Sequence, residues 1–313
     1  MKHLLALRET SAEDIRYLLE SAAVFKEILA RPVKKVPTLR GRVMVTLFYE
    51  NSTRTRTSFE LAAKIMSAEA INIAVAQSSV AKGESLKDTL LTLQSLKADC
   101  VVMRHYASGA AQFAAEKVKN MAIVNAGDGR HEHPTQGLLD MLTIRQNKGE
   151  IEGLTVAIVG DILHSRVARS NIWGLTKLGA KVRLVGPRTL LPPDAARLPV
   201  TVYDDLRAGL EGADVVNVLR LQTERMEKGL LPSLREYARL FGVSVASLKA
   251  AKPGALVLHP GPMNRGVEIS ADVADGKFGV QSAIEEQVTN GIAVRMAVLY
   301  LLMGAQGMPA PDA

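Results

Sequence analysis

The sequence has little cysteine and few aromatic side chains. Cys100 is the single cysteine in 313 residues, so an intrachain disulfide and any metal site built from several cysteines are excluded. It lies in an apolar run, where we expect a buried strand residue. Aromatic residues make up 4% of the chain, and the basic residues are scattered along it. Nucleic-acid surfaces combine basic patches with aromatic stacking platforms, so we expect no nucleic-acid partner.

Long apolar runs are also missing. The N-terminus has a short apolar patch at Leu4 and Leu5 but reaches the charged residues Arg8 and Glu9 at once, unlike a secretory signal peptide. We find no apolar run of membrane-spanning length. The sequence therefore predicts no membrane association and a cytoplasmic location.

The length and the hydrophobic pattern predict two α/β domains. A chain of 313 residues with 47% apolar residues is long enough for two cores. Apolar, β-branched segments alternate with segments of helical periodicity, which is typical of parallel sheets with helices on both faces. A helix that ends near Gly149 suggests a boundary near residue 150, and a long closing helix begins at Glu285. The predicted strands cover residues 42–49, 70–75, 99–104, 121–125, 155–160, 181–185, 201–203, 215–219 and 255–258.

A segment rich in hydroxyls and arginines joins the first of these strands to a helix. It reads Ser52-Thr53-Arg54-Thr55-Arg56. A helix N-terminus presents N–H groups without intrahelical partners and a partial positive charge, which favour an anion. A hydroxyl that only caps the helix is the simpler alternative, but it does not explain three hydroxyls and two arginines in one turn. We predict a phosphate site, which lacks the Walker glycines and lysine. The net charge of +7 also suits small anionic ligands.

This segment resembles the carbamoyl-phosphate signature of the aspartate and ornithine carbamoyltransferases. The resemblance spans nearly the whole chain, and five separate motifs fall in the family's order. It implies transfer of the carbamoyl group of carbamoyl phosphate to an amine, with release of phosphate and without a metal or other cofactor. It also implies that the substrates meet between a carbamoyl-phosphate-binding domain, residues 1–149 completed by helix 285–305, and a second domain, residues 150–284.

The resemblance implies roles for residues of the first half. Ser52, Thr53, Arg54 and Thr55 would bind the phosphate. Thr55, Arg104 and His133 would donate to the carbonyl oxygen, and Gln136 would hold the carbamoyl NH2 group. Taken alone, Arg104 could be a salt-bridged strand end and His133 a capping histidine. Their agreement with the family's order and spacing favours the functional interpretation, whereas His105, His131 and His164 are expected to be structural or solvated. Arg56 is expected to brace the turn.

The polar loop at residues 77–85 resembles a segment that the family inserts into the active site of the neighbouring subunit. Ser78 and Lys82 match the two residues that the family uses there. From the sequence alone, a lysine on such a loop is usually only solvated. The resemblance implies a catalytic role for Lys82 and an assembly of at least three chains, a homotrimer with shared active sites.

The second half favours L-aspartate as the amine. Its two carboxylates call for arginines with planar, bidentate geometry, and Arg166, Arg220 and Gln222 resemble the family's aspartate-binding positions. Ornithine enzymes carry a His-Cys-Leu-Pro stretch, where this chain reads His259-Pro260-Gly261-Pro262, and a Ser-Met-Gly loop that this chain lacks. The resemblance thus implies formation of N-carbamoyl-L-aspartate for pyrimidine synthesis, with ornithine or another amine as the alternative.

One departure concerns the residues after this late motif. Many aspartate enzymes continue directly with an arginine, whereas this chain reads Met263-Asn264-Arg265. A side-chain role for Arg265 is therefore in doubt. The backbone carbonyls of Gly261 and Pro262 can still accept from the amine or carbamoyl nitrogen.

Two other functions fit the sequence less well. A nicotinamide-dependent dehydrogenase would need G-x-G-x-x-G after the strand at 155–160 and an acidic residue ending the next strand. Only Gly160 is present, and the next strand ends in Val185-Gly186-Pro187. A non-catalytic phosphate- or nucleic-acid-binding module leaves Arg166, Arg220 and Gln222 unexplained. A regulatory chain or a dihydroorotase as a further partner stays open.

Overall fold

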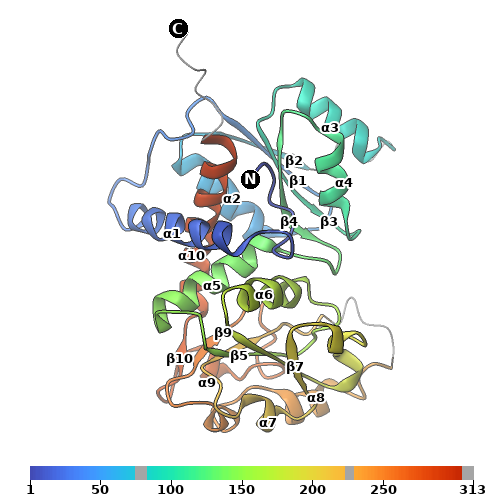
Figure 1. Ribbon diagram of the computed structural model, residues 1–313, viewed down its shortest axis with the longest axis vertical. Helices are drawn as coiled ribbons and strands as arrows, with labels where there is room; N and C mark the ends of the chain where they lie inside the picture. Colours follow the sequence, from blue (N-terminus) through green and yellow to red (C-terminus); the bar gives the residue numbers. More distant parts are fainter. Residues whose placement is uncertain (75–82, 223–228, 305–313) are drawn as a thin grey trace. The chain divides into compact units, whose positions relative to one another are not determined.

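The computed structural model describes residues 1–74, 83–222 and 229–304. The chain divides into two compact units, Met1–Leu138 with Thr289–Ala313 and Leu139–Val288 (Figure 1). Both junctions fall inside helices, α5 (Pro134–Lys148) and α10 (Ile284–Leu299). Each unit contains one sheet, and every strand pair in both sheets is parallel. The predicted α/β class is confirmed.

The first unit is built on a four-stranded sheet in the order β2-β1-β3-β4. β1, β3 and β4 are largely buried, as expected for strands covered on both faces, whereas the edge strand β2 exposes Glu69, Ile71 and Asn72. Cys100, which opens β3, is fully buried as expected, and burial raises the pKa of its thiol. The strands are β1 (Val43–Phe48), β2 (Glu69–Ala74), β3 (Cys100–His105) and β4 (Ala122–Asp128).

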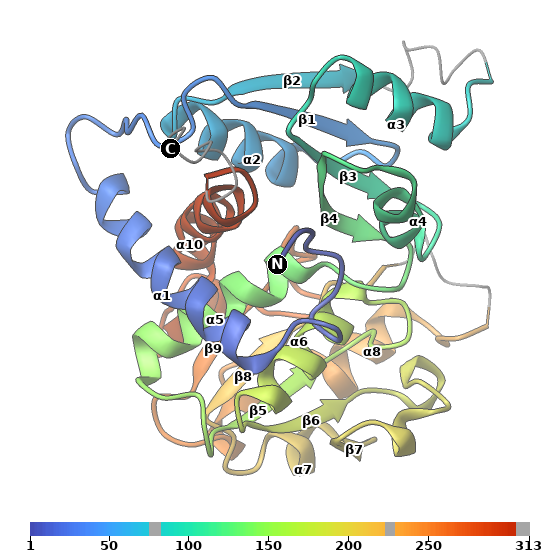
Figure 2. The same cartoon turned by 45° about the horizontal axis from the view of Figure 1, so that its top comes forward.

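Helices cover the two faces of this sheet in the way that right-handed crossovers require. The chain moves outward from β1 to β2 through α2, then back across the sheet to β3 through α3, so α2 lies on the opposite face from α3 and α4 (Figure 2). Leu90 of α3 and Ala111 of α4 pack with Val101 in one core cluster. Ser11 caps α1 by accepting from the backbone N–H of Asp14. These helices are α1 (Ala12–Leu29), α2 (Thr53–Ile65), α3 (Leu86–Ser95) and α4 (Ala110–Lys117).

The residues before α1 pair with the outer edge of β4. Leu4 forms a parallel bridge with Val124, and its N–H donates to the carbonyl of Ile123 at 2.9 Å. The carboxylate of Glu132 then accepts from the backbone N–H of Leu7 at 2.7 Å. This segment covers a strand edge that would otherwise present unpaired backbone groups.

The second unit is built on a six-stranded sheet in the order β10-β9-β8-β5-β6-β7. All residues of β8 and β9 are buried, as expected for central strands of a parallel sheet. The strands are β5 (Thr155–Val159), β6 (Lys181–Val185), β7 (Val200–Tyr203), β8 (Val215–Val218), β9 (Leu256–Leu258) and β10 (Gln281–Ser282).

Short helices contribute to the core of the second unit. Leu210 of α7, Phe241 of α8 and Val273 of α9 share one cluster with Val159 and Val257 from the sheet. The helices are α6 (Arg166–Lys177), α7 (Leu206–Leu210), α8 (Leu234–Phe241) and α9 (Ala271–Ala274), and short 3-10 turns lie at Arg188–Leu190, Ala195–Arg197 and Ser247–Ala250.

The closing helix corrects one expectation from the sequence. Among the described residues, one helix, Ile284–Gly304, is long and apolar enough to cross a membrane, and it includes a π-helical turn at Tyr300–Gly304. In its most apolar window, 67% is buried inside the protein. Length and composition alone therefore fit a membrane span, but the burial is that of a core helix.

Candidate active site

The strand order of the first unit reverses between β1 and β3, and the predicted phosphate segment lies at this point. In open parallel sheets, ligands bind at the carboxyl ends of the strands where the strand order reverses. Residues 52–55 follow β1, and Arg104 is paired with Phe48, the last residue of β1. The N–H of Tyr49 donates to the carbonyl of Arg104 at 2.8 Å. The two predicted phosphate- and carbonyl-binding segments are thus neighbours at one sheet edge.

The start of α2 has the features of an anion site. Ser52 is the N-cap residue with an extended backbone, φ −156° and ψ 96°, and within the described structure its side chain makes no capping hydrogen bond. The first turn also contains no acidic side chain to neutralise the positive end of the helix. Thr55 is buried, whereas Thr53 and Arg54 are exposed. The capping alternative weighed from the sequence is therefore not what Ser52 does.

Arg104 is held in place by a carboxylate from the same site. Its Nε lies 3.4 Å from Oε2 of Glu50, and its Nη1 donates to the carbonyl of Ala126 at 3.5 Å. Sequence reasoning gave Glu50 no role, because the pair depends on β1 lying beside β3. The available signal was a carboxylate at one strand end and an arginine at another.

His133 and Gln136 lie at the start of α5 and are both buried. The N–H of Gln136 donates to the carbonyl of His133 at 2.9 Å, which closes the first turn of the helix. Their spacing of three residues puts both side chains near one helix face. The structure therefore brings them to the carboxyl side of β4, in the sheet that also carries residues 52–55 and Arg104.

Asp128 organises the turn that leads from β4 to His133. It contacts Nδ1 of His131 at 3.1 Å and accepts from the side-chain amide of Asn125 at 2.8 Å. Burial by itself would raise the pKa of Asp128, but these hydrogen bonds outweigh it and lower that pKa. The hydrogen bond with Asp128 raises the pKa of His131.

A buried arginine from the closing helix contacts α2 and was missed by the sequence analysis. Arg295 is 4% exposed, donates to the hydroxyl of Ser58 at 2.9 Å and lies over the ring of Phe59 at 5.1 Å. Burial lowers its pKa to about 10, so it stays charged at neutral pH. The sequence feature that could have revealed this residue is a single arginine within a mostly apolar helix. It adds a buried positive charge to the unit that contains the anion site.

The second unit has its own reversal point, between β5 and β8, and its candidate residues lie there. Arg166 follows β5, Arg220 and Gln222 follow β8, and residues 259–262 follow β9. These three strands are neighbours in the order β9-β8-β5 and are parallel. Their carboxyl ends meet at one edge of the sheet, which is where open α/β sheets bind ligands.

A hydrogen-bonded turn after β5 ties Arg166 and Gln222 to the same place. Asp161 contacts Nδ1 of His164 at 2.8 Å, and the Gln222 side chain donates to the carbonyl of His164 at 3.3 Å. Burial raises the pKa of Asp161, and the hydrogen bond with His164 opposes that shift. Ser165 caps α6 by accepting from the N–H of Ala168 at 3.1 Å. Arg166 is thereby fixed as the first, buried residue of that helix.

Gly160 is required where this turn leaves β5. Its φ is +126°, and a Cβ there would lie 3.2 Å from the carbonyl oxygen of Leu219 and 3.1 Å from the hydroxyl of Tyr237. This glycine therefore allows the turn after β5 to approach the end of β8 closely. The glycine that resembles part of a dinucleotide-binding motif is therefore explained by close packing against Leu219 and Tyr237.

The remaining predicted residues are Ser78, Lys82, Gly261 and Pro262. Ser78 and Lys82 lie outside the described residues. The peptide bond between Gly261 and Pro262 is cis, and both residues lie at the carboxyl edge after β9. Arg265 forms an ion pair with Asp275 at 2.7 Å, in which both side chains are exposed.

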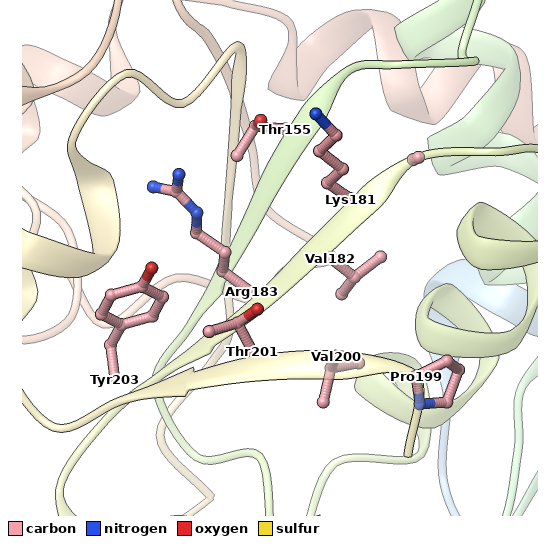
Figure 3. Close-up of a pocket in the computed structure, with 9 residues that line it drawn as sticks. Thr155, Lys181, Val182, Arg183, Pro199, Val200, Thr201 and Tyr203 are labelled. Carbon is pink, nitrogen blue, oxygen red and sulfur yellow. The ribbon is translucent and has the colours of Figure 1, made fainter.

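A hollow of about 480 Å³ in the second unit contains none of the candidate residues (Figure 3). Thr155, Lys181 and Val200, which open β5, β6 and β7, line it, so it lies toward the amino ends of those strands. Arg183 on its wall packs over the ring of Tyr203 at 5.4 Å. This hollow is at the opposite end of the strands from the predicted site.

Two family models cover nearly the whole chain. Residues 2–146 match the carbamoyl-P binding domain of aspartate/ornithine carbamoyltransferase, and residues 152–302 match its Asp/Orn binding domain. The chain belongs to the aspartate/ornithine carbamoyltransferase family, and the resemblance found in its sequence is confirmed.

Within this family, the curated relatives of high identity are aspartate carbamoyltransferase catalytic subunits. The chain is 62% identical over 309 residues to the one from Heliobacterium modesticaldum, covering 99% of this chain and 98% of the relative. It is 62% identical over 303 residues to the one from Moorella thermoacetica, covering 97% of each.

Solved structures of both branches of the family share the fold. Aspartate transcarbamoylase from Trypanosoma cruzi in complex with N-(phosphonacetyl)-L-aspartic acid is 33% identical, with a TM-score of 0.86 over 96% of each chain. Ornithine carbamoyltransferase from Pyrococcus furiosus is 29% identical, with a TM-score of 0.87 over 98% of each chain. The fold therefore does not separate the two acceptors, whereas the sequence identities favour the aspartate branch.

Proposed function

We propose that this protein transfers the carbamoyl group of carbamoyl phosphate to the amine of L-aspartate, giving N-carbamoyl-L-aspartate and phosphate. The observation that carries the proposal is the start of α2, where hydroxyls and Arg54 surround a helix N-terminus without a side-chain cap or an acidic residue in its first turn. The names of the relatives that are about 60% identical over nearly the full chain support the same activity.

The residues of the first unit supply what carbamoyl transfer needs. The amine attacks the carbonyl carbon, negative charge grows on the carbonyl oxygen, and the bond to phosphate breaks. Thr55, Arg104 and His133 donate to that oxygen, which is the electrostatic stabilisation that acyl transfer requires. Ser52, Thr53 and Arg54 bind the phosphate, and the departing phosphate accepts the proton of the amine.

The remaining groups orient the two reactants. The side chain of Gln136 and the carbonyls of Gly261 and Pro262 hold nitrogen atoms of the reacting groups, which fixes the attack geometry. Arg166 and Arg220 bind the two carboxylates of L-aspartate through planar, charge-assisted hydrogen bonds, and Gln222 assists them. Ornithine, the alternative acceptor, carries a second amine in place of a carboxylate and has no use for a second arginine.

The assembly, location and domain bounds are part of the proposal. The active protein is a homotrimer in the cytoplasm, and Ser78 and Lys82 of one chain complete the site of its neighbour. Functionally, residues 1–149 with helix 285–305 bind carbamoyl phosphate and residues 150–284 bind aspartate. The product serves pyrimidine synthesis, and a regulatory chain or a dihydroorotase is a candidate partner. The family resemblance supports the assembly, the domain bounds and the role of the product.

Phosphate release from carbamoyl phosphate by the purified protein tests the proposal. L-aspartate and L-ornithine are compared as acceptors at equal concentration, with a reaction lacking any acceptor as the blank. We expect turnover with aspartate alone. Turnover with ornithine would keep the phosphate site and overturn the assignment of Arg166 and Arg220, and turnover with neither would overturn the reaction.

A further inference from the structure

The segment that follows β9 is fastened by a buried pair, His259 and Glu268. The backbone N–H of Gly261 donates to Nδ1 of His259 at 2.8 Å, so the ring proton lies on Nε2 and points to Oε1 of Glu268 at 3.2 Å. The same carboxylate oxygen accepts from the backbone N–H of Asn264. Both side chains are fully buried. Glu268 therefore joins the beginning and the end of residues 259–264.

This fastened segment is anchored to the core of the second unit on its other side. The N–H of His259 donates to the side-chain oxygen of Gln287 at 2.9 Å, and the amide of Gln287 donates to Asp140 at 2.7 Å. Asn171 of α6 donates to the same carboxylate at 2.7 Å. Hydrogen bonds to a buried carboxylate are stronger than neutral ones, so the segment has a rigid base.

From this base, Asn264 contacts the segment that carries the aspartate-binding candidates. Its side-chain amide donates to the carbonyl of Leu221 at 3.3 Å, and Leu221 lies between Arg220 and Gln222. Asn264 also falls within the stretch 263–265, where the chain departs from the pattern of many aspartate enzymes. Glu268 fixes the backbone of Asn264, so the hydrogen bond from the Asn264 side chain to Leu221 also restrains residues 220–222.

We propose that Asn264 is a positioning residue for aspartate binding. Through the carbonyl of Leu221, it couples the 259–264 segment, which offers the Gly261 and Pro262 carbonyls, to Arg220 and Gln222. This inference rests on the proposed function, since it assumes that these residues bind substrate. The loss of such a contact weakens the binding of ground state and transition state alike, which raises KM and leaves kcat nearly unchanged.

Steady-state kinetics at saturating carbamoyl phosphate test the coupling with Asn264→Ala and Asn264→Asp. We expect the alanine variant to raise the aspartate KM about three- to ten-fold, as the loss of one ordinary hydrogen bond would, with kcat within about two-fold of wild type. Asn264→Asp should raise the aspartate KM further, because it places a negative carboxylate next to the carbonyl oxygen of Leu221 and the two repel each other. The matched control is Asn147→Ala, which removes an amide that donates to Thr143 and Glu286 elsewhere in the same unit. Equal aspartate KM values in the Asn264 variants and the control would overturn the proposal.

Hydrogen exchange of the protein without substrate gives a readout that does not depend on activity. The backbone N–H of Gln222 belongs to the same peptide group as the carbonyl of Leu221, which accepts from Asn264. We expect it to exchange faster in Asn264→Ala than in wild type, and at the wild-type rate in Asn147→Ala. Unchanged exchange in Asn264→Ala would overturn the coupling. If the wild-type protein failed to use aspartate while Gln222 exchanged faster in Asn264→Ala, the proposed function would be wrong and the structural link would stand.

Discussion

Replacement of Arg54 by alanine should separate catalysis from stability. Arg54 is exposed in the first turn of α2, where a positive side chain opposes the helix dipole. Alanine removes that unfavourable charge and is a better helix former, so the free energy of unfolding should stay within about 0.5 kcal/mol of wild type or rise slightly. Two charge-assisted hydrogen bonds to phosphate, by contrast, contribute about 3–4 kcal/mol together.

That difference sets the expected size of the kinetic effect. Since about 1.4 kcal/mol corresponds to a factor of ten, Arg54→Ala should lower kcat/KM for carbamoyl phosphate about 10²- to 10³-fold. Arg56→Ala is the matched control in the same turn, because Arg56 lies 3.9 Å from Glu60 in a weak, partly exposed pair. Phosphate release and urea unfolding are measured for both variants. A kcat/KM for Arg54→Ala within about two-fold of wild type, or an equal loss in Arg56→Ala, would refute the phosphate assignment.

Three further variants test other parts of the structure. His131→Asn should lower the free energy of urea unfolding most between the ordinary pKa values of Asp128 and His131, 3.8 and 6.5. The raised pKa of His131 means that its contribution is complete below 6.5 and is lost as pH rises through the folded value. The lowered pKa of Asp128 means that its contribution is lost as pH falls through the folded value, so a pH-independent difference would contradict this pairing. Gly160→Ala should destabilise the protein by about 1–3 kcal/mol in urea, because its φ of +126° and a backbone oxygen 3.2 Å from the new Cβ both oppose a side chain; an unchanged midpoint would show that the turn relaxes. Mixing inactive Lys82→Ala chains with inactive Arg54→Ala chains should restore part of the activity through shared sites, and no recovery after subunit exchange would place Lys82 within its own chain or outside catalysis.

Local sequence signals predicted the strand-turn-helix unit around residues 43–65. A β-branched apolar run, hydroxyls at a helix start and the spacing of Phe59 and Ala63 all act within a few residues of one another, so they could be read without the tertiary structure. The capping of α1 by Ser11 was predictable for the same reason.

Features that depend on distant contacts could not be predicted in this way. The pair of Glu50 with Arg104 requires β1 to lie beside β3, and the bond of Arg295 to Ser58 joins residues 237 positions apart. The short helices α8 and α9, of eight and four residues, are also hard to predict, because they are shorter than the window of about 11–18 residues over which a helical period is recognised. Their formation is decided by burial of residues such as Phe241 against the sheet.

The first residues of the chain pair with β4 and help to hold the segment that carries His133. Glu132, the residue before His133, accepts from the backbone N–H groups of Leu7 and Arg8. A chain shortened by its first eight residues would lose both donors. It would also expose the outer edge of β4, a strand in which every residue is buried. Purification tags and trimmed versions are therefore better placed elsewhere, because a cut that looks remote in sequence would act one residue from a catalytic candidate.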